Sequence, residues 1–175
     1  MKPVAKKATP AAIAVLRQAT KISPSRMKAS DGLLPSKAHQ VQNPNSDHNT
    51  GLAVDLTHDP ARRIDCHEIY EQLKKDKRVK YLIFNKQIWI PGRGDKPYTG
   101  SNPHTKHLHI SIKDNCGNDE SPWFTWLDKP KKTAKAIVKV AISKVQTPKK
   151  KPVKTSNNKL RSKSLLTLLF KKGKK

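Results

Sequence analysis

The sequence predicts an α+β fold, with a small, mainly antiparallel sheet, flanking helices and a basic C-terminal tail. Two segments, residues 51–56 and 107–112, alternate strictly between large apolar side chains and small or polar ones, which is typical of half-buried strands. Other stretches of the same region show apolar residues at helical spacing. Helices set around such a sheet define the α+β class.

Charge divides the 175-residue chain into a domain and a tail. The net charge is +24, and the last 45 residues carry 16 basic side chains and no acidic one. A segment of like charge repels itself and buries little. We therefore predict a basic extension over residues 1–9, a folded domain over 10–128 and a Lys-rich tail over 129–175. Within the tail, residues 133–145 and 159–172 have amphipathic spacing.

The first half of the domain is predicted to contain a helix, a long loop and a strand. The helix spans residues 10–21 and begins with a proline, which suits the first turn. Its candidate core residues are Ile13, Val15 and Leu16. Residues 23–50 are rich in Ser, Asn and Pro, and we expect a long loop of the kind that often carries function. In the strand over residues 51–56, the core-facing side chains are Leu52, Val54 and Leu56.

The second half is predicted to add a helix, a hairpin and a last strand. Residues 65–77 form the expected helix, with lysines in its final turn. Two β-rich runs, residues 79–84 and 87–90, flank Asn85-Lys86 and predict a hairpin. A Gly/Pro-rich connection leads to the last strand, which would direct Leu108, Ile110 and Ile112 to the core and His107, His109 and Ser111 to the opposite face.

Histidines bracket the two alternating strands and suggest a metal site. His48 comes just before the first strand, Asp55 lies on that strand's polar face, and His109 lies on the polar face of the second. Two imidazoles and one carboxylate are a ligand set that leaves the fourth position of Zn²⁺ open for water. His107, two residues from His109 on the same face, is the candidate general base for that water.

The same residues resemble a known group of zinc peptidases. It contains D-Ala-D-Ala carboxypeptidases, vancomycin-resistance dipeptidases, murein endopeptidases and hedgehog-type domains. The resemblance covers roughly residues 12–113, and small phage and bacterial proteins of the group are the most similar. It is carried by Ser46-Asp47-His48, Gly51, Ala53 and Asp55, then by the run from Asn102 to His109. It implies hydrolysis of amide bonds in peptidoglycan stem peptides or cross-links.

One departure from the group concerns the general base. Many of its enzymes carry Glu or Asp three residues before the last zinc-binding histidine. If that histidine is His107, the corresponding residue of this chain is His104, and if it is His109, the corresponding residue is Lys106. We favour His48, Asp55 and His109 as Zn²⁺ ligands, with His107 as base and His104 assisting. The alternative makes His107 a ligand and His104 the base. The missing carboxylate also leaves open a weak or inactive peptidase.

Four further residues are candidates for supporting roles. Arg26, early in the loop, is a candidate ligand for a substrate carboxylate, and the same loop offers Ser46 and His39 for substrate binding. Asp47 would either fix the turn through its side chain or orient a ligand histidine from behind.

These features predict a Zn²⁺-dependent peptidoglycan peptidase, either a phage lysin or a virion-associated wall hydrolase. A non-catalytic wall-binding or virion structural protein on the same fold is the alternative. We expect the cationic tail to contact anionic membrane or lipopolysaccharide. Virion proteins are further candidate partners. Nucleic acid is a less favoured partner, because no nucleic-acid recognition motif accompanies the positive charge. The N-terminal apolar run ends after six residues at Arg17. We therefore expect synthesis in the host cytoplasm without a signal peptide, and action at the cell wall or carriage in a virion.

Overall fold

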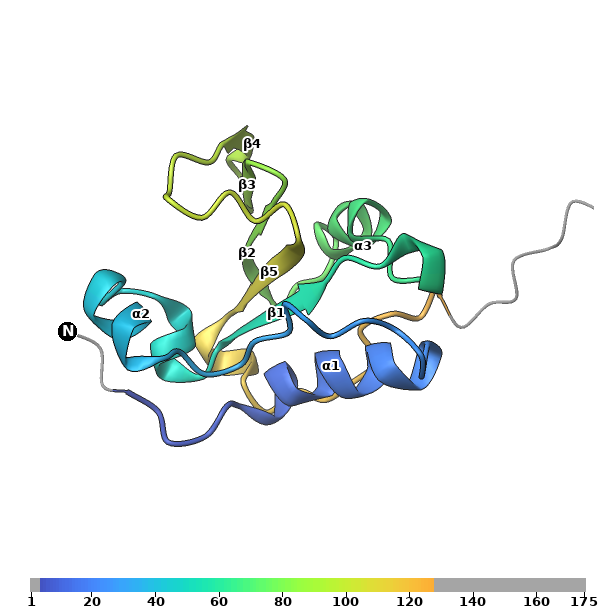
Figure 1. Ribbon diagram of the computed structural model, residues 1–175, viewed down its shortest axis with the longest axis horizontal. Helices are drawn as coiled ribbons and strands as arrows, with labels where there is room; N and C mark the ends of the chain where they lie inside the picture. The colour runs from blue at the N-terminus through green and yellow to red at the C-terminus, as the bar shows by residue number, and fades with distance from the viewer. Residues whose placement is uncertain (1–3, 128–175) are drawn as a thin grey trace, which may run out of the picture. The chain divides into compact units, whose positions relative to one another are not determined.

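The computed structural model describes residues 4–127 and confirms the α+β fold. A single antiparallel sheet has the strand order β1-β5-β2-β3-β4 (Figure 1). In that order the strands are β1 (Ala53–Thr57), β5 (His107–Ile112), β2 (Val79–Phe84), β3 (Gln87–Ile90) and β4 (Gly94–Pro97). The last strand in sequence thus inserts between β1 and β2, which brings its histidines beside β1.

Three α-helices and three short 3-10 helices accompany the sheet in the described residues. They are α1 (Pro10–Ile22), α2 (Lys37–Gln42), η1 (Asp47–Thr50), η2 (Pro60–Arg62), α3 (Cys66–Leu73) and η3 (Asp114–Cys116). No helix within residues 4–127 has the length and apolar character needed to span a bilayer.

One face of the sheet carries the hydrophobic core. Its fully buried side chains, together with those of α1, α3 and the segment after η3, form one cluster. From β1, β5 and β2 the cluster includes Val54, Leu56, Leu82, Leu108, Ile110 and Ile112. The alternation predicted for both histidine-flanking strands is therefore confirmed, and their polar residues lie on the other face.

The core-facing side of α1 differs from the one expected. Val15 is fully buried, whereas Ile13 is 42% exposed. The helix packs against the sheet through small residues instead, namely Ala11, Ala12, Ala14 and Ala19. Alanines allow the helix backbone to approach the sheet closely, and they give a weak hydrophobic signal in the sequence.

Two element boundaries also differ from the prediction. β1 begins at Ala53 because Gly51 has φ +71 and ends η1, and a Cβ at that position would lie 2.7 Å from the backbone oxygen of Lys7. α3 ends at Leu73, four residues early, and the Lys74 ammonium pairs with Asp95 on β4 at 2.8 Å. Long-range contacts thus determine where β1 begins and where α3 ends.

Two elements arise where only connections were expected. α2 begins at Ser36, whose hydroxyl accepts a hydrogen bond from the backbone N–H of His39, but none of its residues is buried. β4 is exposed throughout and is built from Gly, Asp, Lys and Pro. Neither has an apolar pattern, so periodicity could not reveal them.

The predicted hairpin is confirmed. β2 and β3 pair across Asn85 and Lys86, whose φ values are +45 and +65. Two consecutive left-handed residues give the type I′ turn that matches the twist of a two-residue hairpin. Backbone bonds from these residues to the oxygens of His104 and Pro103 fix the loop before β5 to this turn.

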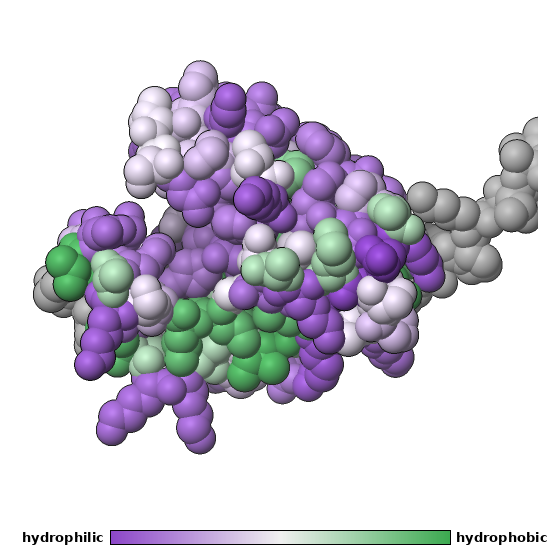
Figure 2. Space-filling model, viewed as in Figure 1, coloured by the Kyte–Doolittle hydropathy of each residue, from purple (hydrophilic) through white to green (hydrophobic). Residues whose placement is uncertain are grey.

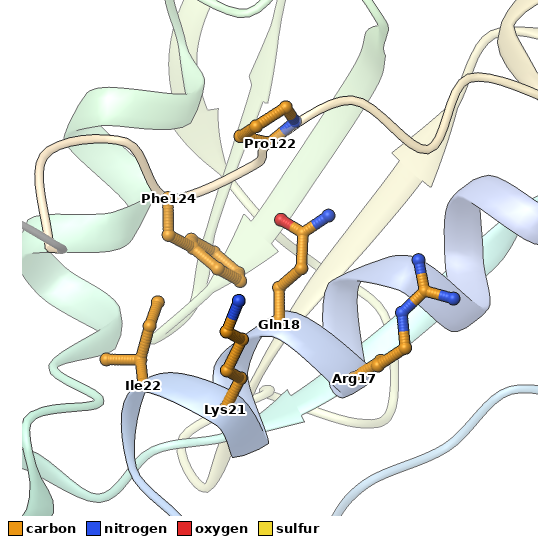
Figure 3. Close-up of a pocket in the computed structure, with 6 residues that line it drawn as sticks. All are labelled: Arg17, Gln18, Lys21, Ile22, Pro122 and Phe124. Atoms are coloured by element: carbon orange, nitrogen blue, oxygen red, sulfur yellow. The ribbon is translucent and has the colours of Figure 1, made fainter.

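The segment after η3 closes the core beside α1. Trp123 and Phe124 are almost completely buried, and the backbone N–H of Trp123 donates to the side chain of Gln18 at 2.7 Å. A hollow of about 310 Å³ remains at this seam, and Phe124 points into it (Figure 3). The predicted tail, residues 129–175 with its amphipathic segments 133–145 and 159–172, lies outside the described residues.

The revised packing of α1 predicts unequal effects for two neighbouring truncations. Val15→Ala should lower the free energy of unfolding by about 2 kcal/mol because it leaves a cavity in the core. Ile13→Ala should change it by less than about 0.5 kcal/mol, because that side chain is half exposed. Urea denaturation of both variants provides the measurement. Equal losses would contradict the alanine-mediated packing of α1.

Candidate metal centre

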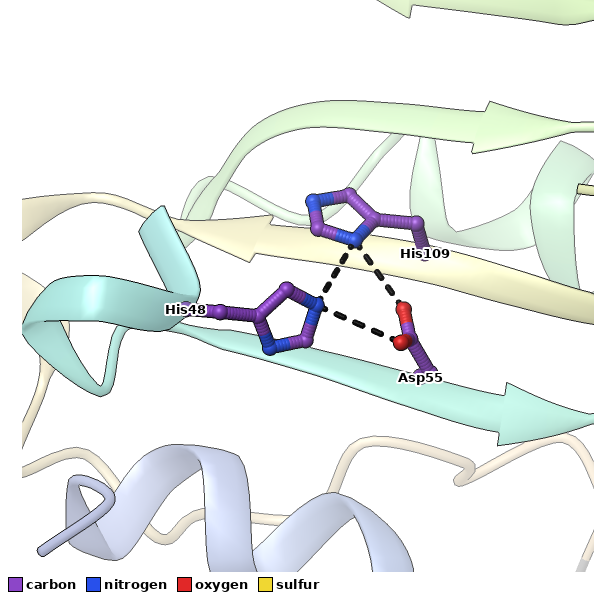
Figure 4. Close-up of side chains that lie close together, drawn as sticks. All are labelled: His48, Asp55 and His109. Carbon is purple, nitrogen blue, oxygen red and sulfur yellow. Dashed lines mark hydrogen bonds and ion pairs between the residues drawn. The ribbon is translucent and has the colours of Figure 1, made fainter. Parts of the chain in front are cut away.

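His48, Asp55 and His109 come together on the polar side of the sheet (Figure 4). Each is supplied by a different element, η1, β1 and β5 respectively. Asp55 and His109 are direct partners in the β1–β5 register. His109 Nδ1 lies 3.0 Å from Asp55 Oδ1, His48 Nε2 lies 3.3 Å from Asp55 Oδ2, and the two ring nitrogens are 3.2 Å apart.

These three atoms are close enough to hold a metal ion. Ligands bonded at about 2.1 Å in a tetrahedral arrangement are about 3.4 Å from one another, and the observed separations of 3.0–3.3 Å are close to that value. Two imidazoles and a carboxylate supply three of four tetrahedral positions. The set therefore fits a metal ion with one position left for a small molecule.

Residues of the preceding loop orient two of these ligands. His48 Nδ1 donates to the backbone oxygen of Leu33 at 2.8 Å, so Nε2 keeps its lone pair for a metal, which is the usual arrangement behind a ligand histidine. Gly32 pairs with Asp55 through both backbone groups. A Cβ on Gly32 would lie 3.0 Å from Asp55 Oδ2, so a larger residue there would press on the carboxylate.

Electrostatics favour a charged carboxylate at the centre. Burial would raise the pKa of Asp55, but hydrogen bonds from His109 and His48 outweigh it and hold the pKa far below its usual value. For His48, burial lowers the pKa, but the nearby Asp55 carboxylate reverses the effect and raises it overall. The carboxylate is thus ionised and ready to bind a cation.

His104 and His107 lie next to this centre and share Asp55 with it. His107 Nε2 is 3.7 Å from Asp55 Oδ1, and the rings of His104 and His107 are 4.9 Å apart. Burial and the neighbouring histidines lower the pKa of His104 to about 4, and burial also lowers that of His107. Both rings are therefore neutral near pH 7 and able to accept a proton.

A pocket of about 520 Å³ opens over the centre. The surface is hollowed between α2 and the β3–β4 hairpin, and hydrophilic side chains surround the hollow (Figure 2). Ser46 and His39, both predicted to bind substrate, line this pocket and contact each other at 3.2 Å. His104 also lines it, whereas His107 is not among the lining residues.

Asp47 holds η1 on the sheet through its buried carboxylate. Its carboxylate is buried and accepts hydrogen bonds from Lys80 Nζ at 2.9 Å and from Ser111 Oγ. These contacts join η1 to β2 and β5, and Leu33 rather than Asp47 receives the His48 Nδ1 hydrogen bond. Asp47 therefore fixes the position of His48 by holding η1 on the sheet.

Arg26 is not placed to bind a substrate carboxylate. Its side chain is only 1% exposed and forms an ion pair with Asp31 at 2.6 Å. The remaining guanidinium contacts go to Thr20 Oγ1 and the backbone oxygen of Met27. Asp31 also accepts bonds from Thr57 at the end of β1. The pair thus fastens the loop that carries Gly32 and Leu33.

Sequence reasoning did not identify Gly32, Leu33 or Tyr81. Leu33 acts through its backbone oxygen, which leaves no side-chain signal. The Asp31-Gly32 dipeptide is a turn signal, but it does not indicate which side chain the glycine faces. Tyr81 pairs with Ser111 across β2 and β5 and stacks on His109 with ring centroids 5.5 Å apart. Only the register of the sheet places it there.

No family model matches the chain, and no curated protein or solved structure gives a match.

The buried Arg26–Asp31 pair predicts a loss of stability that an exposed pair does not share. Arg26→Met should lower the free energy of unfolding by about 3 kcal/mol, because it leaves a largely buried carboxylate without its partner. Arg17→Met is the control: Arg17 pairs with Glu120, but both side chains are exposed, and the loss should stay below about 1 kcal/mol. Urea denaturation at pH 7 measures both.

The same pair predicts a pH dependence. Burial raises the pKa of Asp31, but bonds from Arg26 and Thr57 lower it overall. A carboxyl whose pKa is lowered by folding stabilises the fold above its unfolded pKa of about 3.9 and loses this contribution as the pH falls. The difference in stability between wild type and Arg26→Met should therefore shrink below about pH 4. A difference that does not depend on pH would contradict this role of Asp31.

Proposed function

We propose that the protein is a Zn²⁺-dependent peptidase acting on peptidoglycan, as a lysin or a virion-associated wall hydrolase. The observation that carries the proposal is the convergence of His48, Asp55 and His109 at 3.0–3.3 Å beneath an open pocket. Two imidazoles and a carboxylate with an open position are typical of catalytic rather than structural zinc sites. The sequence pattern shared with zinc peptidases of the cell wall suggests the substrate.

The residues around the centre have separable roles in this proposal. When bound, Zn²⁺ supplies Lewis acidity, which polarises a scissile carbonyl and makes water a better nucleophile. His107 and His104, neutral near pH 7, accept and return the proton during hydrolysis. We assign His107 as the base that takes a proton from the attacking water. His104, whose ring lies 4.9 Å away and which lines the pocket, would receive that proton from His107 and give it to the leaving amine. His39 and Ser46, which also line the pocket, contact the substrate.

A non-catalytic wall-binding protein is the second candidate. One observation favours it: Asp55, already a metal ligand, is the one carboxylate among the pocket-lining residues that the structure describes. A peptidase of this chain must therefore use histidine as its base. The expected contact of the tail with anionic membrane, lipopolysaccharide or virion proteins stays a prediction, because the tail lies outside the described residues.

The pocket favours cleavage of an internal amide bond over cleavage of the C-terminal bond of a peptide substrate that ends in a free carboxylate. No lysine or arginine of the described region lines the pocket. Its amide, serine and tyrosine side chains are Gln42, Asn43, Asn45, Ser46, Tyr81, Tyr98, Ser101 and Asn102. Arg26 is buried against Asp31, and Lys106 is exposed outside the lining. Because a desolvated carboxylate needs a charged partner, we propose an endopeptidase rather than a carboxypeptidase.

Hydrolysis of purified sacculi tests the proposed activity. The full chain loaded with Zn²⁺ should release soluble muropeptides whose masses identify the cleaved amide, and a chelator should stop the release until Zn²⁺ is restored. His109→Ala should lose both the metal and the activity. His107→Ala should keep the metal while its rate falls at least about 100-fold, as expected for loss of a general base.

A matched surface variant separates these effects from general damage. His67 is exposed on α3, and His67→Ala should keep full activity. The peptidase proposal would be wrong if His109→Ala kept full activity, or if metal-loaded wild type released no muropeptides. The non-catalytic wall-binding protein would then be the remaining candidate.

A pair of synthetic stem peptides tests the endopeptidase preference. The two peptides are identical except that the C-terminal residue next to the scissile amide ends in a carboxamide in one and a carboxylate in the other. The carboxamide should be cleaved with at least about tenfold higher kcat/KM, which corresponds to about 1.4 kcal/mol. Mass spectrometry of the products measures both rates. Faster cleavage of the carboxylate form would indicate a carboxypeptidase.

A further inference from the structure

Asp55 belongs to two groups of metal-ligating side chains. The first is the centre with His48 and His109, and the second consists of Asp55, His104 and His107. In each group, one ligand atom from every residue lies within 4.8 Å of the others. Both oxygens of the carboxylate face the first group, with Oδ2 3.3 Å from His48 and Oδ1 3.0 Å from His109. Oδ1 also lies 3.7 Å from His107 and is therefore shared with the second group.

The imidazoles of the second group have unused ligand atoms. His107 Nε2 is buried and has no hydrogen-bond partner among residues 4–127. Buried ring nitrogens are nearly always bonded, so this atom is available to a ligand. His104 Nδ1 is engaged with the backbone oxygen of Asn102 at 2.6 Å, so its Nε2 carries the lone pair.

The backbone at His104 is constrained into an unusual conformation. Its φ is +51, in the left-handed region that non-glycine residues seldom adopt. The side chain of Asn102 accepts a hydrogen bond from the His104 N–H at 3.1 Å, and the His104 oxygen accepts one from Asn85. Such strain is concentrated at functional sites, and here it fixes the ring beside His107.

We propose that Asp55, His104 and His107 form a second cation site, joined to the first by the bridging Asp55 carboxylate. The chemistry of two imidazoles and one carboxylate oxygen selects a transition cation such as Zn²⁺. The second cation binds more weakly than the first, because two dications repel each other and one carboxylate serves both. Pairs of metal ions held close together in this way occur in hydrolases.

Occupation of the second site has a consequence for the proposed peptidase. His104 and His107 are the groups that move protons in that proposal, and an imidazole nitrogen bound to a cation cannot accept a proton. Excess metal therefore inhibits hydrolysis. This consequence rests on the proposed function, whereas the second site itself does not.

A Zn²⁺ titration of the metal-free full chain, followed by calorimetry and native mass spectrometry, tests the site without any measurement of activity. Wild type should bind two equivalents, the second at least about tenfold more weakly. His107→Gln and His104→Gln should each bind one equivalent with the affinity of the first, and this retained tight binding also shows that the variant is folded. His67→Ala is the control and should bind two.

One equivalent in wild type would overturn the second site and show that both groups describe one ion. Two equivalents in both glutamine variants would also overturn it, because the weak binding would then lie elsewhere. Neither result depends on hydrolysis of peptidoglycan, so failure of this site and failure of the proposed peptidase are distinguishable.

Discussion

The antiparallel pairing of β1 with β5 is the contact on which the rest of the structure depends. In this register Val54 is opposite Ile110 and Leu56 is opposite Leu108 on the core face, while Asp55 is opposite His109 on the other. Side chains alternate along a strand, so a slip of one residue would exchange the two faces. The burial that stabilises the domain therefore also aligns the two strand-borne ligands.

The third ligand depends on polar contacts that tie loops to the sheet. His48 belongs to η1, which Asp47 joins to Lys80 and Ser111, and the ring of His48 is fixed by Leu33. The segment around Leu33 is itself held by the Arg26–Asp31 pair against the end of β1. Buried ionic and backbone contacts thus hold the loop in position, as hydrophobic packing holds the strands.

The sequence predicts most of the sheet and the clustering of His48, Asp55 and His109, for a physical reason. Strands with one buried face have a period of two, which places Asp55 and His109 on the polar side. The prediction was wrong where packing or long-range contacts determine whether a side chain is exposed. Ile13 is exposed because alanines face the core, and Arg26 is buried because it pairs with Asp31 across the loop. Leu33 contributes to the site through its backbone oxygen, and Tyr81 contributes through the register of β2 with β5. A local sequence pattern predicts neither.

The residues before α1 have a consequence for any manipulation of the chain. The backbone N–H of Ala5 donates to Asn49, that of Thr9 donates to Gly51, and the Thr9 hydroxyl donates to the same Gly51 oxygen. The segment predicted as a mere basic extension is thus fastened along η1, the element that carries His48. A fusion partner or a protease acting at this end of the domain would therefore disturb the candidate metal centre from outside the pocket.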